Sequence, residues 1–272
     1  SLVGSEMCIR DRTHRGAVVH VGDRVRVEAI DCDHARAVVA EVEPRSSFLV
    51  RPPVANASCI LVAVAVKQPS FDAHQVSRFL ITAEKTGLQV LLVLTKCDLL
   101  DADALSQLRT RLRGWGYEPM LVSTRSGMGL EELHAQLATV PISVLCGPSG
   151  VGKTSLLNAL LPGLALRVGA VSGRLQRGRH TTRHVELHAF SPGSRVADTP
   201  GFNRPELPDD VSNLEVLFPE LRVQLDQHPC RFRDCLHRDE PGCGVTRDWE
   251  RYSLYRKAVE EILEISRPFR AG

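Results

Sequence analysis

Residues 142-ISVLCGPSGVGKTSLLNALL-161 combine a short apolar run, a glycine-rich turn and a helix-like segment. The run at 142–146 predicts a buried strand, and the residues from 154 onward predict a helix. Between them stands Gly147-x4-Gly152-Lys153-Thr154, which has the spacing of a phosphate-binding loop. Such a loop wraps a phosphate with its backbone N–H groups, aided by the positive end of the helix dipole. The stretch therefore predicts a nucleotide-binding α/β unit.

The residue types of this loop suggest a role for each position. Lys153 should reach the β- and γ-phosphates of a nucleotide, and the Thr154 hydroxyl should ligate Mg²⁺. A structural turn without a ligand is the alternative, and the strand–loop–helix setting disfavours it. The predicted nucleotide-binding residues of the loop are Gly147, Pro148, Ser149, Gly150, Val151, Gly152, Lys153, Thr154 and Ser155.

The segments around the loop alternate between strand-like and helix-like patterns. Continuous apolar runs are typical of parallel strands that are buried on both faces of a sheet. Such runs occupy 59–66, 90–94, 119–123 and 142–146, helix-like segments occupy 72–86, 101–113 and 129–139, and strand-like pieces follow at 184–190 and 195–198. The alternation predicts an α/β fold with a doubly wound, mostly parallel sheet.

A second phosphate-reading motif, 198-DTPG-201, ends the last of these strands. The Asp198 carboxylate can hold Mg²⁺ through water, and the Gly201 N–H can meet the γ-phosphate. Alone, this pattern is most often a turn, but after a phosphate-binding loop it becomes a strong partner. The stretch 163–183 before it holds five arginines and no acid, which predicts a mobile loop.

The stretch 95-TKCD-98 ends an apolar run and indicates which base is bound. The Asp98 carboxylate can accept two hydrogen bonds from the guanine N1–H and exocyclic amine, which adenine cannot offer, and the Lys96 stem can cover the ring. Thr95 stands where such motifs usually carry Asn, and it keeps a hydroxyl that can brace the loop. A strand end capped by polar residues is an equal alternative when the stretch is taken alone.

The loop 123-STRSGMGL-130 stands where backbone N–H groups would meet the guanine O6, so Ser123, Thr124 and Arg125 are predicted to bind the nucleotide. This signal is weak by itself. The elements occur in the order base reader, base loop, phosphate-binding loop, mobile loop and D-x-x-G. A doubly wound sheet tolerates this order, because chain ends lie at the surface and are often close together. The order is that of a circularly permuted GTP-binding domain.

A cysteine and histidine cluster, 230-CRFRDCLHRDEPGC-243, follows the nucleotide-binding segments. Three thiolates and one imidazole form a closed tetrahedral set of the kind that holds structural Zn²⁺. The predicted ligands are Cys230, Cys235, His237 and Cys243. Small buried cysteines beside an exposed histidine are the alternative. Three arginines and Phe232 interleave with the ligands and would suit RNA phosphates and bases, although a solvated basic face explains the arginines nearly as well.

Composition limits the remaining possibilities. The net charge of +2 is too small to imply a polyanionic partner, so any basic surface must be local. Eight cysteines, of which three are clustered with a histidine, fit a reducing compartment and a metal site better than a disulfide framework. The longest apolar run is far shorter than the roughly 20 residues that a membrane helix needs.

The first part of the chain has short β-like runs at 18–30, 37–42 and 48–52. They predict a small barrel, but only about three of its usual strands, which number about five, are visible. Residues 1–12 lack the apolar core of a signal peptide. We expect them to be a non-native leader, with the true N-terminus missing.

Together, the permuted order, 178-GRHTT-182, D-T-P-G followed by Phe202, and the C-terminal Cys/His cluster resemble the RsgA (YjeQ) family of small-ribosomal-subunit biogenesis GTPases. The resemblance covers about 17–266 and includes the C-x4-C-x-H-x5-C spacing of the predicted metal ligands. It implies a partial OB-fold at 13–56, a circularly permuted GTPase domain at 57–207, and a zinc-binding, partly helical domain at 208–272.

The catalytic residue is suggested by the resemblance rather than by the motifs alone. Phe202 stands where many GTPases place a water-orienting Gln, and its ring cannot hydrogen-bond a water. The resemblance points to the histidine of G-R-H-T-T, His180, whose imidazole can orient a water near neutral pH. An exposed or RNA-facing loop histidine is the alternative. Thr181 or Thr182 should complete the Mg²⁺ coordination, and the sequence does not decide between them.

These patterns predict a cytoplasmic, monomeric GTPase that acts late in small-subunit maturation, uses Mg²⁺ with GTP, carries one structural Zn²⁺ and contacts no membrane. Its partners would be the small ribosomal subunit and its rRNA; the subunit would stimulate hydrolysis, and hydrolysis would drive release. Because D-T-P-G directly precedes the zinc module, loss of the γ-phosphate would reorient an RNA-binding surface. The alternatives are a GTP-locked RNA-binding checkpoint protein without hydrolysis and an ATP-dependent P-loop enzyme with a zinc finger.

Overall fold

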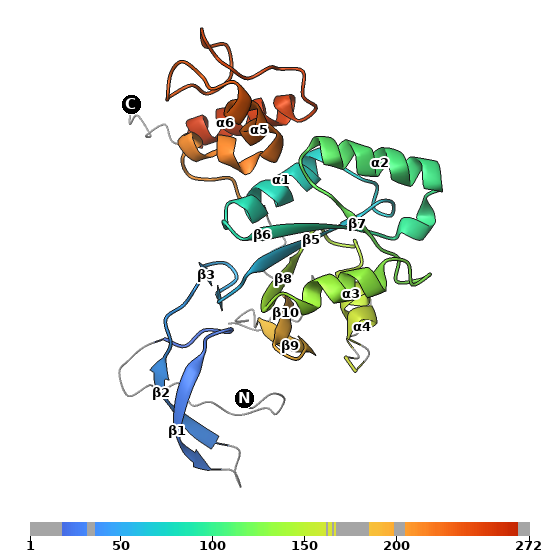
Figure 1. Ribbon diagram of the computed structural model, residues 1–272, viewed down its shortest axis with the longest axis vertical. Helices are drawn as coiled ribbons and strands as arrows, with labels where there is room; N and C mark the ends of the chain where they lie inside the picture. The colour runs from blue at the N-terminus through green and yellow to red at the C-terminus, as the bar shows by residue number, and fades with distance from the viewer. Residues whose placement is uncertain are drawn as a thin grey trace, which may run out of the picture.

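The computed structural model describes residues 18–31, 36–161, 163–164, 166, 185–198 and 205–265. Three sets of predictions lie outside these ranges: the leader at 1–12, most of the loop at 163–183 with His180, Thr181 and Thr182, and the residues Gly201 and Phe202 after Asp198. In Figure 1 a small β region lies at one end of the molecule, a sheet flanked by helices at its centre, and a helical region at the other end.

A six-stranded sheet forms the centre, in the order β7-β6-β5-β8-β10-β9. Neighbouring strands are parallel, except that β9 runs antiparallel to β10 at one edge. The strands are β5 (Cys59–Ala65), β6 (Gln89–Thr95), β7 (Met120–Leu121), β8 (Ile142–Cys146), β9 (Glu186–Ser191) and β10 (Ser194–Asp198). The sheet is thus mostly parallel, as the apolar runs predict.

Helices cover both faces of this sheet (Figure 1). They are α1 (Ala73–Glu84), α2 (Ala102–Gly114), α3 (Leu130–Ala138) and α4 (Lys153–Leu160). Alternate residues of β5 face the two layers: Ile60 and Val62 belong to the core with α1 and α2, whereas Leu61 and Ala63 belong to the core with α3 and α4. All of β5 is buried, as expected for the middle strand of a covered parallel sheet.

Aspartate side chains start the first two helices. Asp72 accepts hydrogen bonds from the backbone N–H groups of His74 and Gln75, and Asp101 accepts one from Ala104. These caps satisfy N–H groups that no helical carbonyl reaches, and their negative charge suits a helix N-terminus. Each helix therefore begins one residue after the start that the sequence pattern predicts.

The chain before the sheet forms two small antiparallel pairs in its described residues. β1 (Val25–Asp31) pairs with β2 (Arg36–Val42), and β3 (Phe48–Leu49) pairs with β4 (Val54–Ala55). The predicted strand at 48–52 is thus only two residues long, and the chain turns back at a second short strand. An OB-type barrel at 13–56 stays a prediction.

The C-terminal region, which we define as residues 205–265, has a core of its own. Its elements are η2 (Val211–Asn213), η3 (Glu215–Leu217), α5 (Pro219–Gln227) and α6 (Tyr252–Ile265). Phe218, Leu221 and Tyr255 pack in this core together with Ile81 of α1. The C-terminal region is therefore docked on the helix that follows β5.

The last described helix, α6, begins only at Tyr252. The residues before it are held in another conformation by two contacts. Thr246 Oγ1 donates a 2.5 Å hydrogen bond to Asp248 Oδ1. The Arg251 side chain is fully buried, and its Nη2 lies 3.4 Å from the carbonyl oxygen of Trp115 at the end of α2. The local turn at 246–248 and the long-range contact of Arg251 therefore set where α6 begins.

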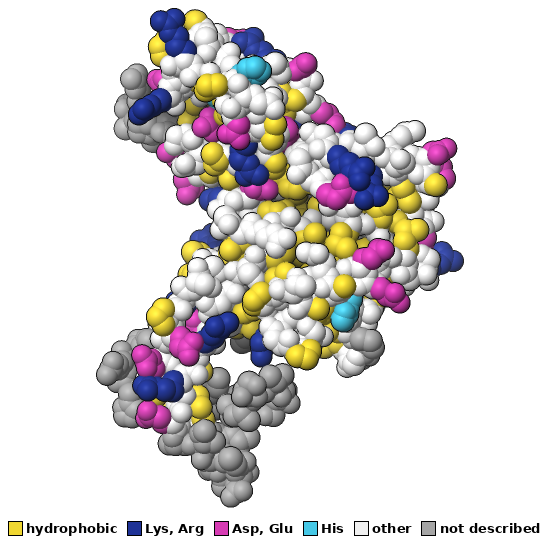
Figure 2. All heavy atoms as spheres, in the orientation of Figure 1, with side chains coloured by type: hydrophobic (Ala, Val, Ile, Leu, Met, Phe, Trp, Pro, Cys, Tyr) yellow, Lys and Arg dark blue, Asp and Glu magenta, His cyan; other side chains and the backbone are white. Residues whose placement is uncertain are grey.

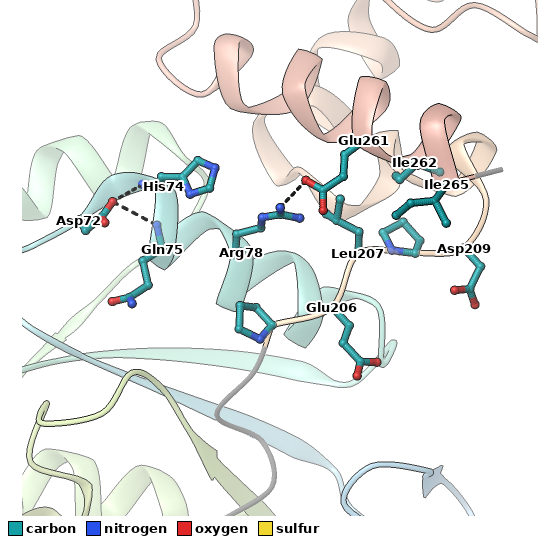
Figure 3. Close-up of a pocket in the computed structure, with 12 residues that line it drawn as sticks. Asp72, His74, Gln75, Arg78, Glu206, Leu207, Asp209, Glu261, Ile262 and Ile265 are labelled. Atoms are coloured by element: carbon teal, nitrogen blue, oxygen red, sulfur yellow. Dashed lines mark hydrogen bonds and ion pairs between the residues drawn. The ribbon is translucent and has the colours of Figure 1, made fainter. Parts of the chain in front are cut away.

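Ion pairs add to the contact between α1 and the C-terminal region. Arg78 donates to Glu261 of α6, and Arg222 Nη1 lies 3.1 Å from Glu84 Oε2. Figure 3 shows the Arg78–Glu261 pair beside a cavity of about 600 Å³. Its walls come from α1, α6 and residues 205–209, which we call the connector. This cavity lies at the junction of the two regions, not at the phosphate-binding loop.

The described surface does not separate into large regions of one charge on the face shown in Figure 2, where basic and acidic side chains are interspersed. This agrees with the small net charge of +2. Among the described helices, none is both long enough and apolar enough to span a membrane.

Candidate nucleotide-binding site and metal centre

The described residues that the sequence predicts to bind the nucleotide and its Mg²⁺ lie where β6, β7, β8 and β10 end. Ligands of doubly wound sheets bind outside the carboxyl ends of the strands. β8 pairs with β5 on one side and with β10 on the other. Because β5 also pairs with β6, the loop after β8 lies between the base-reading segment after β6 and Asp198 at the end of β10, whatever their order along the chain.

The phosphate-binding loop connects β8 to α4, the setting that its motif requires. Gly147 has φ 138°, and a Cβ at this position would lie 2.1 Å from the Ala63 carbonyl oxygen. Only glycine lets the loop leave β8 so close to β5. Gly152, with φ 94°, directly precedes α4 in a conformation that also favours glycine. The loop N–H groups are thus gathered at a helix N-terminus, where they can bind an anion.

Lys153 lies over this loop. Its Nζ donates hydrogen bonds of 2.8 Å to the carbonyl oxygens of both Gly147 and Pro148. Burial lowers the pKa of Lys153, while the neighbouring Cys146 and Asp198 act in the opposite direction. Asp198, at the end of β10, pairs with Leu145 of β8, the strand that leads into this loop. The ammonium group is therefore positioned at the loop, where a phosphate chain would lie.

The predicted Mg²⁺ ligands within the described residues belong to adjacent elements. Thr154 lies in the first turn of α4, and Asp198 is the last residue of β10, in register with Leu145 of β8. A hydroxyl and a carboxylate are oxygen donors of the kind that Mg²⁺ prefers. The donor set fits the ion, and the assignment of these two residues as ligands stays a prediction.

Lys96 joins the base-reading segment to the phosphate-binding loop. It adopts a left-handed conformation with φ 58°, and its Nζ lies 2.7 Å from the Gly150 carbonyl oxygen and also donates to the Gln68 carbonyl. Gln68 is a residue that sequence reasoning missed. Its place just beyond the end of β5, at the edge where ligands bind, is the signal that would have found it.

Asp98 is held by a buried serine. Ser123 Oγ donates a 2.6 Å hydrogen bond to Asp98 Oδ1, and accepts from the backbone N–H groups of Arg125 and Ser126 at 3.2 Å. Ser123 is fully buried, whereas Thr124 and Arg125 are exposed in the same loop. Ser123 therefore orients the carboxylate that would read guanine. That Ser123, Thr124 and Arg125 bind the nucleotide stays a prediction.

Thr95 braces β6 against the phosphate-binding loop. Its Oγ1 lies 2.6 Å from the Val151 carbonyl oxygen and 3.2 Å from that of Val64. A hydroxyl has one proton to donate, and the nearer acceptor is in the phosphate-binding loop. The bracing contact expected of this hydroxyl is thus present, although the residue is Thr where Asn is usual.

Removing this hydroxyl should weaken nucleotide binding. We expect Thr95→Val to lose about 1–2 kcal/mol of GTP affinity, roughly 5- to 30-fold, because a buried carbonyl in the phosphate-binding loop loses its donor. Thr95→Ser, which keeps the hydroxyl, is the matched control and should bind GTP nearly as well as the parent. Competition against a fluorescent GDP analogue measures both, and equal affinities for the two variants would remove Thr95 from loop bracing.

The cysteine and histidine ligands predicted from spacing come together in the C-terminal region. Their four candidate donor atoms lie within 4.8 Å of one another. The two nearest contacts place His237 Nδ1 3.4 Å from Cys230 Sγ and 3.6 Å from Cys243 Sγ. A tetrahedral Zn²⁺ with bonds of about 2.3 Å to sulfur and about 2.0 Å to nitrogen separates its ligand atoms by roughly 3.5–3.8 Å. The residues Cys230, Cys235, His237 and Cys243 therefore fit this ion.

The segment that carries these ligands, residues 230–243, is held by its surroundings. His237 has a left-handed backbone with φ 54°. The Tyr252 hydroxyl oxygen lies 3.0 Å from the carbonyl oxygens of both His237 and Arg238, which share its one proton, and the Glu240 carboxylate accepts the backbone N–H of Arg238 at 2.7 Å. These contacts fix a turn that the sequence alone does not specify.

The chemistry of the cluster favours a bound cation. Burial raises the pKa of the Cys235 thiol to about 12, and burial also raises the pKa of Cys243. Without a cation these thiols would therefore keep their protons; a Zn²⁺ bound there would displace the protons, hold the sulfurs as thiolates and cross-link the turn to the core of the C-terminal region.

Comparison with known proteins places the chain in a family. Residues 42–208 match the model of the RsgA GTPase family. A relative from Synechococcus sp. (strain CC9311), named small ribosomal subunit biogenesis GTPase RsgA, is 71% identical over 274 residues, which cover 100% of this chain and 90% of the relative. This chain belongs to the RsgA GTPase family. The resemblance found in the motifs is thereby confirmed.

Solved structures of RsgA-like proteins agree with the fold. A crystal structure of YjeQ from Thermotoga maritima has a TM-score of 0.75 and 35% identity, covering 90% of this chain and 84% of that one. YloQ, described as a circularly permuted GTPase, has a TM-score of 0.73 and 31% identity, covering 92% and 82%. As a member of the RsgA GTPase family, the chain is a GTP-hydrolysing enzyme. This sets aside both the non-hydrolytic and the ATP-dependent alternatives.

Proposed function

We propose that this GTPase acts in late maturation of the small ribosomal subunit, that the subunit stimulates its hydrolysis of GTP, and that hydrolysis drives its release. The observation that carries the proposal is the 71% identity, along the whole chain, to a relative named as a small ribosomal subunit biogenesis GTPase. The proposed organisation is a partial OB-fold at 13–56, a permuted GTPase domain at 57–207 and a zinc-binding domain at 208–272. We further propose that it works as a cytoplasmic monomer.

The nucleotide site supports the chemical part of the proposal. Asp98, held by Ser123, would read guanine, and Lys153 would neutralise the β- and γ-phosphates. Mg²⁺ would neutralise developing charge on the phosphates, with Thr154 and Asp198 as its ligands. We propose His180, outside the described residues, as the group that orients the attacking water.

An exposed aromatic residue supports an RNA partner. Phe232, between the metal ligands, is 49% exposed, and the Arg231 guanidinium carbon lies 5.5 Å from its ring centroid. An exposed ring beside a cation can stack on an unpaired base while the cation meets a phosphate. We propose that this surface of residues 230–243 contacts rRNA.

The connector provides a route from the phosphate site to that surface. It follows the D-T-P-G segment, and Glu206 N donates to Thr82 Oγ1 at 2.9 Å while Lys85 Nζ donates to the Leu207 carbonyl at 3.3 Å. A displacement of D-T-P-G on phosphate loss would therefore act on α1 and on the C-terminal region docked against it. We propose that release follows this route.

Hydrolysis measured with and without purified small subunits tests the proposal. We expect stimulation of about 100-fold or more if the subunit positions a general base or water-orienting group. Large subunits at the same concentration are the control, and His180→Ala should lose most of the stimulation while still binding GTP.

The release step is checked in the same preparation by co-sedimentation with GDP or a non-hydrolysable GTP analogue. Tighter association with the analogue is expected. Equal turnover with both subunits would refute a role specific to the small subunit, and equal association with both nucleotides would refute release by hydrolysis.

A further inference from the structure

The metal cluster touches a carboxylate that its ligand pattern does not contain. Nδ1 of His237 faces the sulfurs of Cys230 and Cys243, and the other ring nitrogen, Nε2, lies 2.7 Å from Glu215 Oε2. Only 1% of the His237 side chain is exposed, so the ring itself is shielded from water, whereas 34% of the Glu215 side chain is exposed. We propose that Glu215 is a positioning residue of the metal site, which accepts a hydrogen bond from the Nε2–H of His237 and so directs the lone pair of Nδ1 at the cation.

The argument rests on the two forms of a neutral imidazole. One ring nitrogen carries a proton and the other carries the lone pair that binds a metal, and the partner of the first decides which is which. An ionised carboxylate can only accept a hydrogen bond. Beside Glu215 the proton is therefore on Nε2, and Nδ1 is free to coordinate. The carboxylate also makes the coordinating nitrogen more basic.

The position of Glu215 in the fold makes the contact firm. Glu215 is the first residue of η3. Leu214, just before it, and Leu217, at the end of η3, are buried in the core of the C-terminal region. The carboxylate is thus presented by a packed segment, 22 residues before the histidine that it holds. Because η3 follows the connector closely, the hydrogen bond also ties the metal-binding segment 230–243 to the chain that arrives from the phosphate site.

Zinc affinity of the full chain tests the role. We expect Glu215→Ala to bind zinc about 10- to 100-fold more weakly, as is typical when the hydrogen-bond partner of a metal-bound histidine is removed. Glu215→Gln keeps an acceptor oxygen and should recover a large part of that loss. Asp226→Ala is the matched control, because Asp226 is an exposed acid on the adjacent α5, and its affinity should equal that of the parent. Competition with a chromophoric chelator measures all three.

A spectroscopic readout separates positioning from simple support of the fold. In ¹⁵N-histidine-labelled, zinc-loaded protein, we expect His237 to show a slowly exchanging Nε2 proton, which Glu215→Ala should lose and Glu215→Gln should retain. Unchanged zinc affinity in Glu215→Ala would overturn the proposal, and so would an unchanged Nε2 signal or equal losses in Ala and Gln. None of these readouts depends on ribosomal subunits, so the proposal can fail while the proposed function stands.

Discussion

Replacing Asp98 with alanine should cost about 3–6 kcal/mol of GTP affinity, roughly 10²- to 10⁴-fold, because two hydrogen bonds to a charged group are lost. Affinity for ATP should change little, since adenine offers neither donor. Most of the preference for guanine over adenine would therefore disappear. Competition of GTP and ATP against a fluorescent GDP analogue measures the change.

Two further variants separate recognition from damage to the loop. Asp98→Asn should favour xanthosine triphosphate, because xanthine carries an oxygen where guanine carries its amine. The asparagine N–H group can donate to this oxygen, and the asparagine oxygen can accept from the N1–H of xanthine. Asp101→Asn removes a nearby charge but keeps a good helix cap, and it should leave selectivity unchanged. A full GTP preference in Asp98→Ala would show that the base is read elsewhere.

Replacing Arg251 with methionine should destabilise the C-terminal region by about 3–5 kcal/mol, the cost of removing one partner from a buried ion pair. Arg251 is fully buried; its Nε lies 2.6 Å from Glu220 Oε1, and its guanidinium carbon lies 4.8 Å from the ring centroids of both Trp115 and Phe218. Without the cation, the Glu220 carboxylate is left without its charged partner beside aromatic rings.

Denaturant unfolding followed by tryptophan fluorescence measures this effect, because Trp115 packs directly on Arg251. Arg222→Met is the matched control. The pair of Arg222 with Glu84 joins the C-terminal region to α1, but the Arg222 side chain is 45% exposed, so its loss should cost about 0–1 kcal/mol of stability. A further change of Glu220 to leucine in the Arg251→Met background should restore much of the stability. Equal losses in the two arginine variants would contradict a special role for Arg251.

The contacts of Arg251 also limit how a structural change at the phosphate site could be passed to the C-terminal region. Arg251 joins α5, through Glu220, to the end of α2, where its Nη2 lies 3.4 Å from the Trp115 carbonyl oxygen. The region is therefore fastened to both α1 and α2. The reorientation of the RNA-binding surface that we propose would therefore have to act through these contacts or break them.

Much of the nucleotide site could be predicted because its signals are contiguous. The glycines of 147–154 are required by backbone geometry within one turn, Asp98 comes three residues after the end of β6, and Asp198 is the last residue of β10. Carboxyl ends of parallel strands meet at one edge of a sheet, so segments far apart in the chain can be assigned to one site. That reasoning holds for a permuted order, because it uses the ends of strands and not their sequence.

The supporting contacts could not be predicted in this way. Ser123 holds Asp98 from 25 residues away, and Arg251 contacts Trp115 across 136 residues. Nothing in the local sequence distinguishes this serine and this arginine from solvated side chains of the same type. His180, Thr181, Thr182 and Gly201 lie outside the described residues, and their roles stay predictions.

The sequence by itself determined the fold class, the phosphate-binding loop, the likeness to permuted GTPases and the spacing of the metal-ligand set, because each depends on periodicity or on residues a few positions apart. The tertiary structure decided which groups hold individual side chains in place. The carbonyls of Gln68 and Gly150 hold Lys96, and the carboxylate of Glu215 holds His237. The ring of Trp115 packs on Arg251. The physical reason is that a polar side chain gains a fixed partner only when packing removes water and brings distant segments within hydrogen-bond distance.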